Sequence, residues 1–493
     1  MKSLARILVL LAPSLAACAR PAREAPWNVL LVTLDTTRAD YLGPYGRPGQ
    51  TPNLERLAAR GTRFDLAIAS AAVTPVAHAA ILTGRDNPGH GLRVLYSDGG
   101  YRLPDDVPTL ATVLKEHGYH TGAVHGSFPV SDFFGFGRGF DHFDDVEATF
   151  YRVGEGGAQR SWNLNRFQRR SDEVSDRALR FLAGVEEPFL LWLHYWDPHD
   201  PAKLPPKEFA PLHGPDEPSG ERATYAREVS YMDGEIGRVV DELERRGALE
   251  RTLVVVVADH GQGLGDHDWS GHRVLYQEQI RVPLLIVVPG QTSEPRVESL
   301  VRTTDILPTL LDYLGVAAPE EMTGRSLRAL MEGGPEEERV AFADQINLFD
   351  LNSLILDKRP LDGLVYVAMD REWKLLYRPL HPEASELYAL GRDPHELENL
   401  LDREPAQVLR LKRLLAEQAP WVLEPFQGSG DGAERAGALQ ALSALGYGGE
   451  EGRPDAPVPW SWICPDPEHP ERADTPEPCA RCGGARIPVV RAR

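Results

Sequence analysis

Three continuous apolar runs, each followed directly by a polar cluster, constrain the fold of this chain more than any other feature. They cover residues 28–34, 189–196 and 252–258, and a fourth apolar run at 283–288 ends in a Pro-Gly pair. Runs without polar alternation are typical of strands that are buried on both faces, as in a parallel sheet. Helical patterns separate the runs, notably over residues 221–246. We therefore expect an α/β fold with a mostly parallel central sheet flanked by helices.

Each of the first three runs ends in a side chain that can bind a metal or an anion. Asp35 follows the first run, Asp197 and His199 follow the second, and Asp259 and His260 follow the third. In such sheets ligands bind outside the carboxyl ends of the strands, so we expect one shared site there. The oxygens of Asp35 and Asp259 with the nitrogen of His260 form a candidate divalent metal site. An isolated Asp-His-Gly sequence is, however, often only a turn.

The segment T-P-V-A-H-A-A-I-L-T-G, at residues 74–84, has two interpretations. In the structural one, Thr74 is a helix N-cap and Pro75 is the first helical residue. In the functional one, the Thr74 hydroxyl lies beside free backbone N–H groups that bind an anionic ester. A nearby metal then activates the hydroxyl as a nucleophile. Taken alone, this segment favours the structural interpretation.

The character of the sequence changes after about residue 333. Shorter alternating strands are predicted at 340–342, 364–369 and 373–377, and a closing helix is predicted at 406–418. We therefore expect two substructures and a tail. They are a larger α/β domain at 27–333, a smaller antiparallel-sheet-plus-helix subdomain at 334–426, a Gly/Ala/Glu/Pro-rich linker at 427–459 and a cysteine-rich tail at 460–493.

The N-terminal sequence predicts export. A short apolar run that begins after two basic residues ends in Leu15-Ala16-Ala17-Cys18, the pattern of a bacterial lipobox. The run is too short for a permanent membrane span. We expect residues 1–17 to be a lipoprotein signal peptide, Cys18 to be lipidated and 18–26 to be a tether. The protein is then membrane-anchored, periplasmic or on the outer surface; the alternative is a free thiol near a frayed terminus.

The charge balance excludes some partners. The chain has 73 acidic and 53 basic residues, a formal net charge of −20. Such a chain repels nucleic acid and anionic lipid at long range, so no nucleic-acid partner is expected. A small anionic ester remains compatible, because a metal and a few local cations dominate a cleft.

Several motifs follow one another in a recognisable order. They are T-L-D-T-T-R-A-D-Y at 33–41, T-P-N-L-E-R at 51–56, T-P-V-A-H-A-A-I-L-T-G-R at 74–85, W-L-H-Y-W-D-P-H-D-P at 192–201, V-A-D-H-G-Q-G-L-G-D-H at 257–267 and E-L-Y-A-L-G-R-D-P-H at 386–395. Together they resemble the sulfatases of the alkaline phosphatase superfamily from about residue 27 to residue 418. The resemblance implies an alkaline-phosphatase-like fold and a metal-dependent hydrolase of sulfate or phosphate esters.

The resemblance also implies which residues bind the metal and attack the ester. Asp35, Asp259 and His260 correspond to metal ligands. Thr74 stands at the nucleophile position, where active sulfatases have a cysteine or serine that becomes formylglycine, and it is expected to be a fourth metal ligand. A threonine cannot become formylglycine, because oxidation of a secondary alcohol gives a ketone.

Four further residues are implied to contact the substrate. His78 stands where sulfatases have an arginine, and it is expected to balance the developing charge together with His199. His272 is expected to protonate the leaving group, and Asp197 is expected to bind substrate with His199 and His272. An alternative is that Asp197, His199 and His272 form a second metal site.

Two other departures bear on the metal and the reaction. The paired aspartates of many sulfatases are Asp35-Thr36 here, and the lysine of the usual Gly-Lys-Trp-His stretch is missing from residues 122–126. The remaining ligands favour Zn²⁺ or Mn²⁺ over Ca²⁺ as the single active-site metal. A threonine nucleophile also resembles superfamily branches that act through phosphothreonine. A phosphodiesterase or phosphotransferase is therefore one alternative, and a non-catalytic anion- or glycan-binding protein is another. The anionic ester could be part of a glycan or a lipid headgroup.

The tail resembles a short heavy-metal-binding module. Cys464, His469, Cys479 and Cys482 supply three thiolates and an imidazole, a set suited to tetrahedral Zn²⁺. The alternative is a disulfide between two of the cysteines in an oxidising compartment.

Overall fold

The computed structural model describes most of the chain between residues 26 and 417. The described ranges are 26–95, 100–146, 168–199, 220–291, 294–335, 338–350 and 354–417, with the short strands β5 (Tyr151–Val153), β6 (Gln159–Ser161), β17 (Trp460–Ile463), β18 (Arg472–Ala473) and β19 (Ile487–Val490) outside them. The predicted lipidation site Cys18 and the predicted tail ligands Cys464, His469, Cys479 and Cys482 lie outside the described residues.

Eight strands form the central sheet, in the order β12-β2-β11-β8-β1-β7-β3-β4. They are β1 (Asn28–Leu34), β2 (Thr62–Ile68), β3 (His120–His125), β4 (His142–Asp144), β7 (Phe189–Tyr195), β8 (Thr252–Ala258), β11 (Arg281–Val287) and β12 (Arg296–Arg302). Strands β8, β1, β7, β3 and β4 are parallel, as are β2 and β12. The predicted mostly parallel sheet is confirmed. Strand β11 is antiparallel to both neighbours, which its apolar run could not reveal because burial on both faces hides strand direction.

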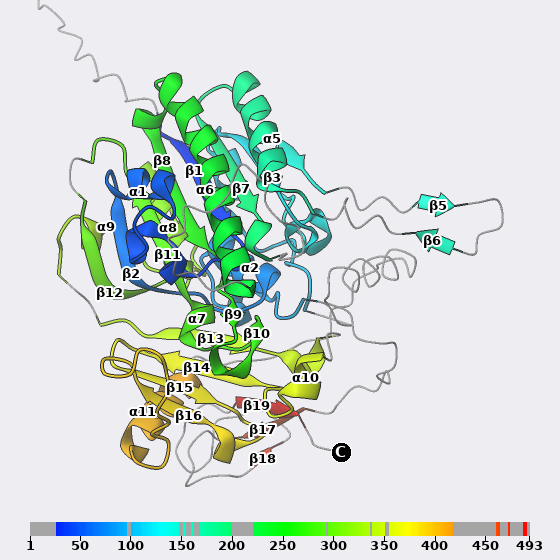
Figure 1. Cartoon of the computed structure of the whole chain (residues 1–493), viewed down its shortest axis with the longest axis vertical. Coiled ribbons are helices and arrows are strands. Elements are labelled where there is room, and N and C mark those ends of the chain that lie inside the picture. The colour runs from blue at the N-terminus through cyan, green and yellow to red at the C-terminus, as the bar shows by residue number, and fades with distance from the viewer. Residues whose placement is uncertain are drawn as a thin grey trace, which may run out of the picture.

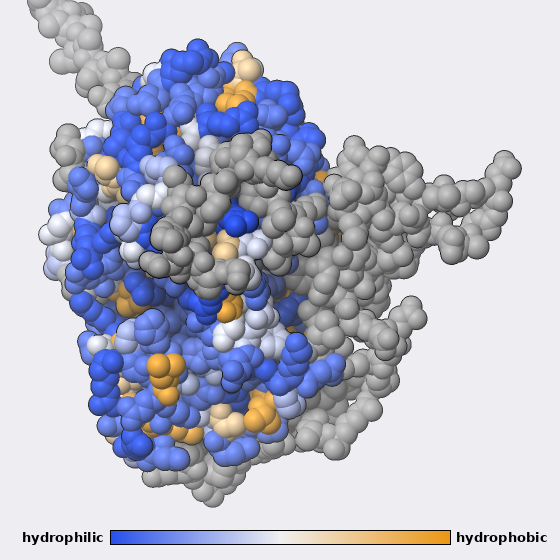
Figure 2. Space-filling view, in the orientation of Figure 1, coloured by the Kyte–Doolittle hydropathy of each residue, from blue (hydrophilic) through white to orange (hydrophobic). Residues whose placement is uncertain are grey.

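Helices α5 and α6 lie side by side against this sheet (Figure 1). The helices are α1 (Pro52–Ala58), α2 (Thr74–Thr83), α3 (Asn87–His90), α4 (Leu110–Glu116), α5 (Ser171–Gly184), α6 (Glu221–Arg245), α7 (Gln277–Ile280), α8 (Ile306–Leu314), α9 (Arg328–Met331), α10 (Leu354–Lys358) and α11 (Pro405–Glu417). Helix α6 buries an apolar stripe that includes Val229, Ile236 and Val240. Hydrophilic residues dominate the visible surface (Figure 2), in keeping with the acidic composition.

A four-stranded antiparallel sheet follows, in the order β13-β14-β15-β16. Its strands are β13 (Ala341–Gln345), β14 (Val365–Met369), β15 (Trp373–Tyr377) and β16 (Glu386–Ala389), and α11 packs on it through Leu411 and Leu415. The predicted strands and closing helix are present, whereas β16 was not predicted. The other face of this sheet shares a core with residues 274–276 of the larger domain. No helix in the described ranges has a segment both long and apolar enough to cross a membrane.

Candidate active site

The Thr74 hydroxyl does not cap a helix. Thr74 is itself the first residue of α2, Val73 is the N-cap, and no side chain makes a capping hydrogen bond there. The structural interpretation of this threonine is therefore wrong. Its Oγ1 lies instead 3.4 Å from Oδ2 of Asp35 and 3.4 Å from Nε2 of His260, and the side chain is buried. Polar groups from β1 and β8 thus surround the hydroxyl.

Asp35 and Asp259 follow the adjacent parallel strands β1 and β8, and both are fully buried. Oδ1 of Asp259 accepts hydrogen bonds from the backbone N–H groups of Thr36 (3.1 Å) and His260 (2.7 Å). Among the described residues, Oδ1 of Asp35 and Oδ2 of Asp259 have no hydrogen-bond donor. Burial raises the pKa of both carboxyl groups well above the ordinary value, and the charge of Asp259 raises that of Asp35 further. Two such carboxylates need a cation to offset their burial.

His260 completes a ligand set for that cation. Its Nδ1 donates to the carbonyl oxygen of Gly261 at 2.9 Å, because a carbonyl can only accept. The lone pair of Nε2 is therefore available to a metal. Ligand atoms of Asp35, Asp259 and His260 lie within 4.8 Å of one another, so the three predicted ligands fit one divalent metal.

The backbone next to Asp35 is strained. Thr36 has φ +47°, which is an unusual conformation for a β-branched residue. The hydroxyl of Tyr225 donates to the Thr36 carbonyl oxygen at 2.6 Å and fixes this conformation. As a result, the Thr36 N–H points at Asp259. Strain held by surrounding contacts is typical of functional sites, and Tyr225 had not been recognised in the sequence.

His199 and His272 lie together beside the metal ligands. Their Nε2 atoms are 3.3 Å apart, and the rings of His272 and His260 are 4.8 Å apart. Nδ1 of His272 donates to the Ala72 carbonyl oxygen at 2.9 Å, and the Trp196 ring stacks on His199 at 3.8 Å. His272 thus lies next to the metal ligand His260, and His199 lies next to His272. Burial lowers the pKa of His199 to about 3 and that of His272 well below its ordinary value, so neither ring carries the expected positive charge in the free protein.

His78 does not supply the positive charge that was expected of it. It is fully buried one turn after Thr74, and its Nδ1 donates to the Thr74 carbonyl oxygen at 2.8 Å. Burial lowers the pKa of His78 to about 3, so the ring is neutral at ordinary pH. Its contacts instead fix the first turn of α2, with Trp192 and His194 packed against the ring.

Asp197 is also placed differently from the expectation. Its carboxylate accepts a hydrogen bond from the Ser171 hydroxyl at the start of α5, and Arg170 lies 3.7 Å away. It forms no metal-ligand group with His199 and His272, so the described residues do not support a second metal site there.

Two further residues that sequence reasoning missed lie at this site. His194 on β7 is fully buried, with Nε2 3.3 Å from Oδ2 of Asp35. Arg273 is buried with φ +82°, and its guanidinium pairs with Asp350 at 2.9 Å. The Arg273 charge lies close enough to lower the pKa of His260, a shift that burial dominates. The sequence held one signal for each residue: His194 is a histidine inside an apolar run, and Arg273 is the residue after His272.

A second group of metal-ligand side chains already has a cation. His267, Glu278 and Glu396 lie together, but the Lys374 ammonium is 2.6 Å from the Glu396 carboxylate. This group joins the larger domain to β15, because Lys374 lies on that strand. It is a structural ion network rather than a second metal site.

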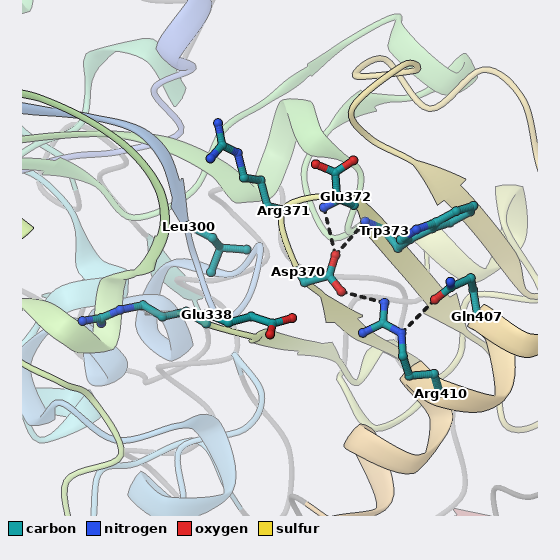
Figure 3. A pocket seen from close by; sticks show the side chains of 9 residues that line it. Leu300, Glu338, Asp370, Arg371, Glu372, Trp373, Gln407 and Arg410 are labelled. Atoms are coloured by element: carbon teal, nitrogen blue, oxygen red, sulfur yellow. Dashed lines mark hydrogen bonds and ion pairs between the residues drawn. The ribbon is translucent and has the colours of Figure 1, made fainter. Parts of the chain in front are cut away.

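A cavity of about 620 Å³ lies apart from these residues, between β12, the β14–β15 turn and α11 (Figure 3). Three of its polar side chains are hydrogen-bonded to one another: Asp370 accepts from Arg410 at 2.6 Å, and Arg410 donates to Gln407 at 2.8 Å. None of the predicted site residues lines it.

Comparisons with known proteins agree with this geometry. Residues 27–316 match the family model described as Sulfatase, and residues 265–419 match one described as N-sulphoglucosamine sulphohydrolase, C-terminal. The chain is 26% identical to an arylsulfatase of Clostridium perfringens, over 76% of this chain and 90% of the relative. It is 23% identical to an N-acetylglucosamine-6-O-sulfatase of Bacteroides thetaiotaomicron, over 80% of this chain and 87% of the relative.

Solved structures of other proteins have the same fold. The phosphonate monoester hydrolase of Agrobacterium radiobacter aligns with a TM-score of 0.63 and 21% identity, over 85% of this chain and 97% of that chain. The cluster of Asp35, Asp259 and His260 has the ligand set for a divalent metal that the resemblance to sulfatases implies. The chain belongs to the sulfatase family and is an ester hydrolase of the alkaline phosphatase superfamily.

Proposed function

We propose that the protein hydrolyses sulfate or phosphate esters with the Thr74 hydroxyl as the nucleophile. The observation that carries this proposal is the environment of the hydroxyl, which lies 3.4 Å from both Asp35 and His260 and caps no helix. An unmodified threonine performs this role without formylglycine.

In the first step, Thr74 Oγ1 forms a bond to sulfur or phosphorus as the bond to the leaving alcohol breaks. The Thr74 hydroxyl proton points to Oδ2 of Asp35, which is placed to accept it. The leaving oxygen gains a proton from the His199–His272 pair, whose facing nitrogens are 3.3 Å apart. Burial keeps both rings neutral in the free protein, so this proton is taken up with the anionic ester, whose charge favours the protonated pair. In the second step water attacks the sulfur or phosphorus atom as the bond to Thr74 Oγ1 breaks. Asp35 returns its proton to Oγ1, the attacking water gives a proton to the histidine pair, and the product leaves as sulfate, phosphate, a phosphate monoester or a phosphonate, according to the substrate.

Asp35, Asp259 and His260 are the residues that would hold the divalent cation. A bound cation would neutralise the carboxylates and polarise the ester oxygens. One imidazole beside two carboxylates suits Zn²⁺ or Mn²⁺ better than Ca²⁺.

Arg273 is proposed to attract the anionic group of the substrate. It would replace the arginine and the lysine that sulfatases have at the positions of His78 and of residues 122–126. His78 is neutral, and the residues at 122–126 contain no lysine. Changing Arg273 to glutamine is expected to raise KM about 10- to 100-fold with a smaller change in kcat, since a hydrogen-bonded cation mainly aids anion binding. Michaelis kinetics and inhibition by inorganic phosphate measure this. Arg273→Lys should recover part of the affinity.

The control for folding is the double variant Arg273→Gln with Asp350→Asn, which leaves no buried carboxylate unpaired. An unchanged KM in a variant that melts like the wild type contradicts this role for Arg273.

The sulfate and phosphate alternatives are separated by one experiment. Purified protein is analysed for bound metal and then incubated with aryl sulfates, phosphodiesters and phosphonate monoesters. Intact mass then identifies the group carried by Thr74. The measurement needs high accuracy, because sulfate and phosphate adducts have nearly equal mass. Product formed on an added alcohol indicates transfer, whereas absence of turnover with every metal supports the non-catalytic binding protein.

Substrate class and location are further parts of the proposal. The Bacteroides thetaiotaomicron relative is named for a sulfated sugar, which supports an anionic ester on a glycan. A lipid headgroup is the alternative. The lipobox before Cys18 supports an exported, lipid-anchored enzyme facing the periplasm or the outer surface.

A further inference from the structure

His194 is a buried histidine that contacts the proposed metal site without being one of its ligands. It lies on β7 and pairs in register with Thr33 of the neighbouring strand β1, two residues before Asp35. Its Nε2 is 3.3 Å from Oδ2 of Asp35 and 3.3 Å from Oγ of Ser127. The ring edge that faces the carboxylate is thus set by the pairing of two central strands.

The negative oxygen of Asp35, together with a chain of hydrogen bonds behind the ring, favours one tautomer of this imidazole. The indole N–H of Trp192 donates to Oγ1 of Thr33 at 3.0 Å, and Oγ1 lies 3.0 Å from Nδ1 of His194. The hydroxyl proton has one other acceptor, the Leu193 carbonyl oxygen, at the longer distance of 3.4 Å. Donation to Nδ1 leaves the ring proton on Nε2, where it faces the negative oxygen of Asp35. The other tautomer would place a lone pair against that oxygen.

The two oxygens of Asp35 therefore have different surroundings. Oδ2 lies 3.3 Å from Nε2 of His194 and accepts from the Thr74 hydroxyl at 3.4 Å, whereas Oδ1 has no donor among the described residues. A carboxylate whose one oxygen is contacted by an imidazole nitrogen and a hydroxyl has the other oriented in advance for a cation. The relay Trp192–Thr33–His194 ends at the oxygen opposite the one available to the metal.

We propose that His194 is a positioning residue that orients Asp35 so that its Oδ1 binds the active-site cation. This inference rests on the metal assignment made under the proposed function. A role in packing alone would be satisfied by the ring contact of His194 with His78, whose centroids are 4.6 Å apart. Packing alone gives no reason for a polar ring whose nitrogens meet Thr33 on one side and Asp35 on the other.

Metal titration of the full-length protein tests this inference without any substrate. Metal-free wild type, His194→Leu, His194→Gln and Thr33→Val are titrated with Mn²⁺ and Zn²⁺ by calorimetry, and each melting temperature is measured without metal. Loss of an outer-sphere partner is expected to weaken metal binding about 10- to 100-fold in His194→Leu. Glutamine keeps an N–H near the position of Nε2, so His194→Gln should recover part of the affinity. Thr33→Val should show a smaller loss than His194→Leu.

Thr252→Val is the matched control, because Thr252 is also buried in the central sheet but lies at the amino end of β8. Its metal affinity should equal that of the wild type. Equal metal affinity in wild type and His194→Leu overturns the inference alone, as does a His194→Gln variant no better than His194→Leu. A wild type that binds neither metal overturns the proposed metal site as well, so the two failures are distinguishable.

Discussion

Changing Thr74 to alanine is expected to lower kcat about 10³-fold or more, with little change in substrate or metal affinity. The reason is that the hydroxyl forms the covalent bond, whereas the metal ligands Asp35, Asp259 and His260 remain. The measurement is single-turnover and steady-state kinetics with the best ester substrate, together with intact mass. The adduct found on the wild type should be absent from the variant.

Two further variants separate chemistry from packing at this position. Thr74→Val keeps the shape of the buried side chain and should be as inactive as Thr74→Ala. Thr74→Ser keeps a hydroxyl and should retain measurable turnover, with intact mass used to show that the serine has not been oxidised. Full activity in Thr74→Val would assign the attack to another group, and a bound water would then be the leading candidate.

The fold was predictable because a strand buried on both faces appears in the sequence as an apolar run, and the polar residue after the run marks the end of the strand. Apolar runs of seven or eight residues identified β1, β7 and β8, and the side chains after them met at one edge of the sheet. The direction of β11 was not predictable, since an apolar run is the same in both directions. Strand β16 (Glu386–Ala389) was missed because its last three residues are all buried, so it does not show the alternation of a strand with one exposed face.

The candidate site was only partly predictable, for a different physical reason. The ends of the apolar runs located Asp35, Asp259 and His260, and the resemblance to sulfatases located Thr74. It could not show that His78 is buried and neutral, since burial depends on the elements packed around α2. It also could not find the His194 contact with Asp35, because that contact depends on the pairing of β1 with β7.

Changing Asp259 to asparagine is expected to raise the stability of the metal-free protein while abolishing most of its activity. Asparagine Oδ1 can still accept from the N–H groups of Thr36 and His260, as Oδ1 of Asp259 does now. The substitution removes one of two buried carboxylates, whose burial raises the pKa of each. Without metal this should stabilise the fold by about 1–2 kcal/mol, as is common when a strained functional site is relaxed.

The same substitution removes a metal ligand, so metal should no longer raise the melting temperature and kcat should fall about 10³-fold. Differential scanning calorimetry with and without Mn²⁺ or Zn²⁺, alongside kinetics, measures both effects.

Asp266→Asn is the control, because Asp266 accepts from Arg38 at 2.6 Å and from Arg222 at 3.0 Å. That variant should be less stable than the wild type and bind metal equally well. The two aspartates thus differ in what holds their charge: Asp266 has arginine partners within the fold, and Asp259 depends on a metal. A metal-free Asp259→Asn variant that melts below the wild type would refute this distinction.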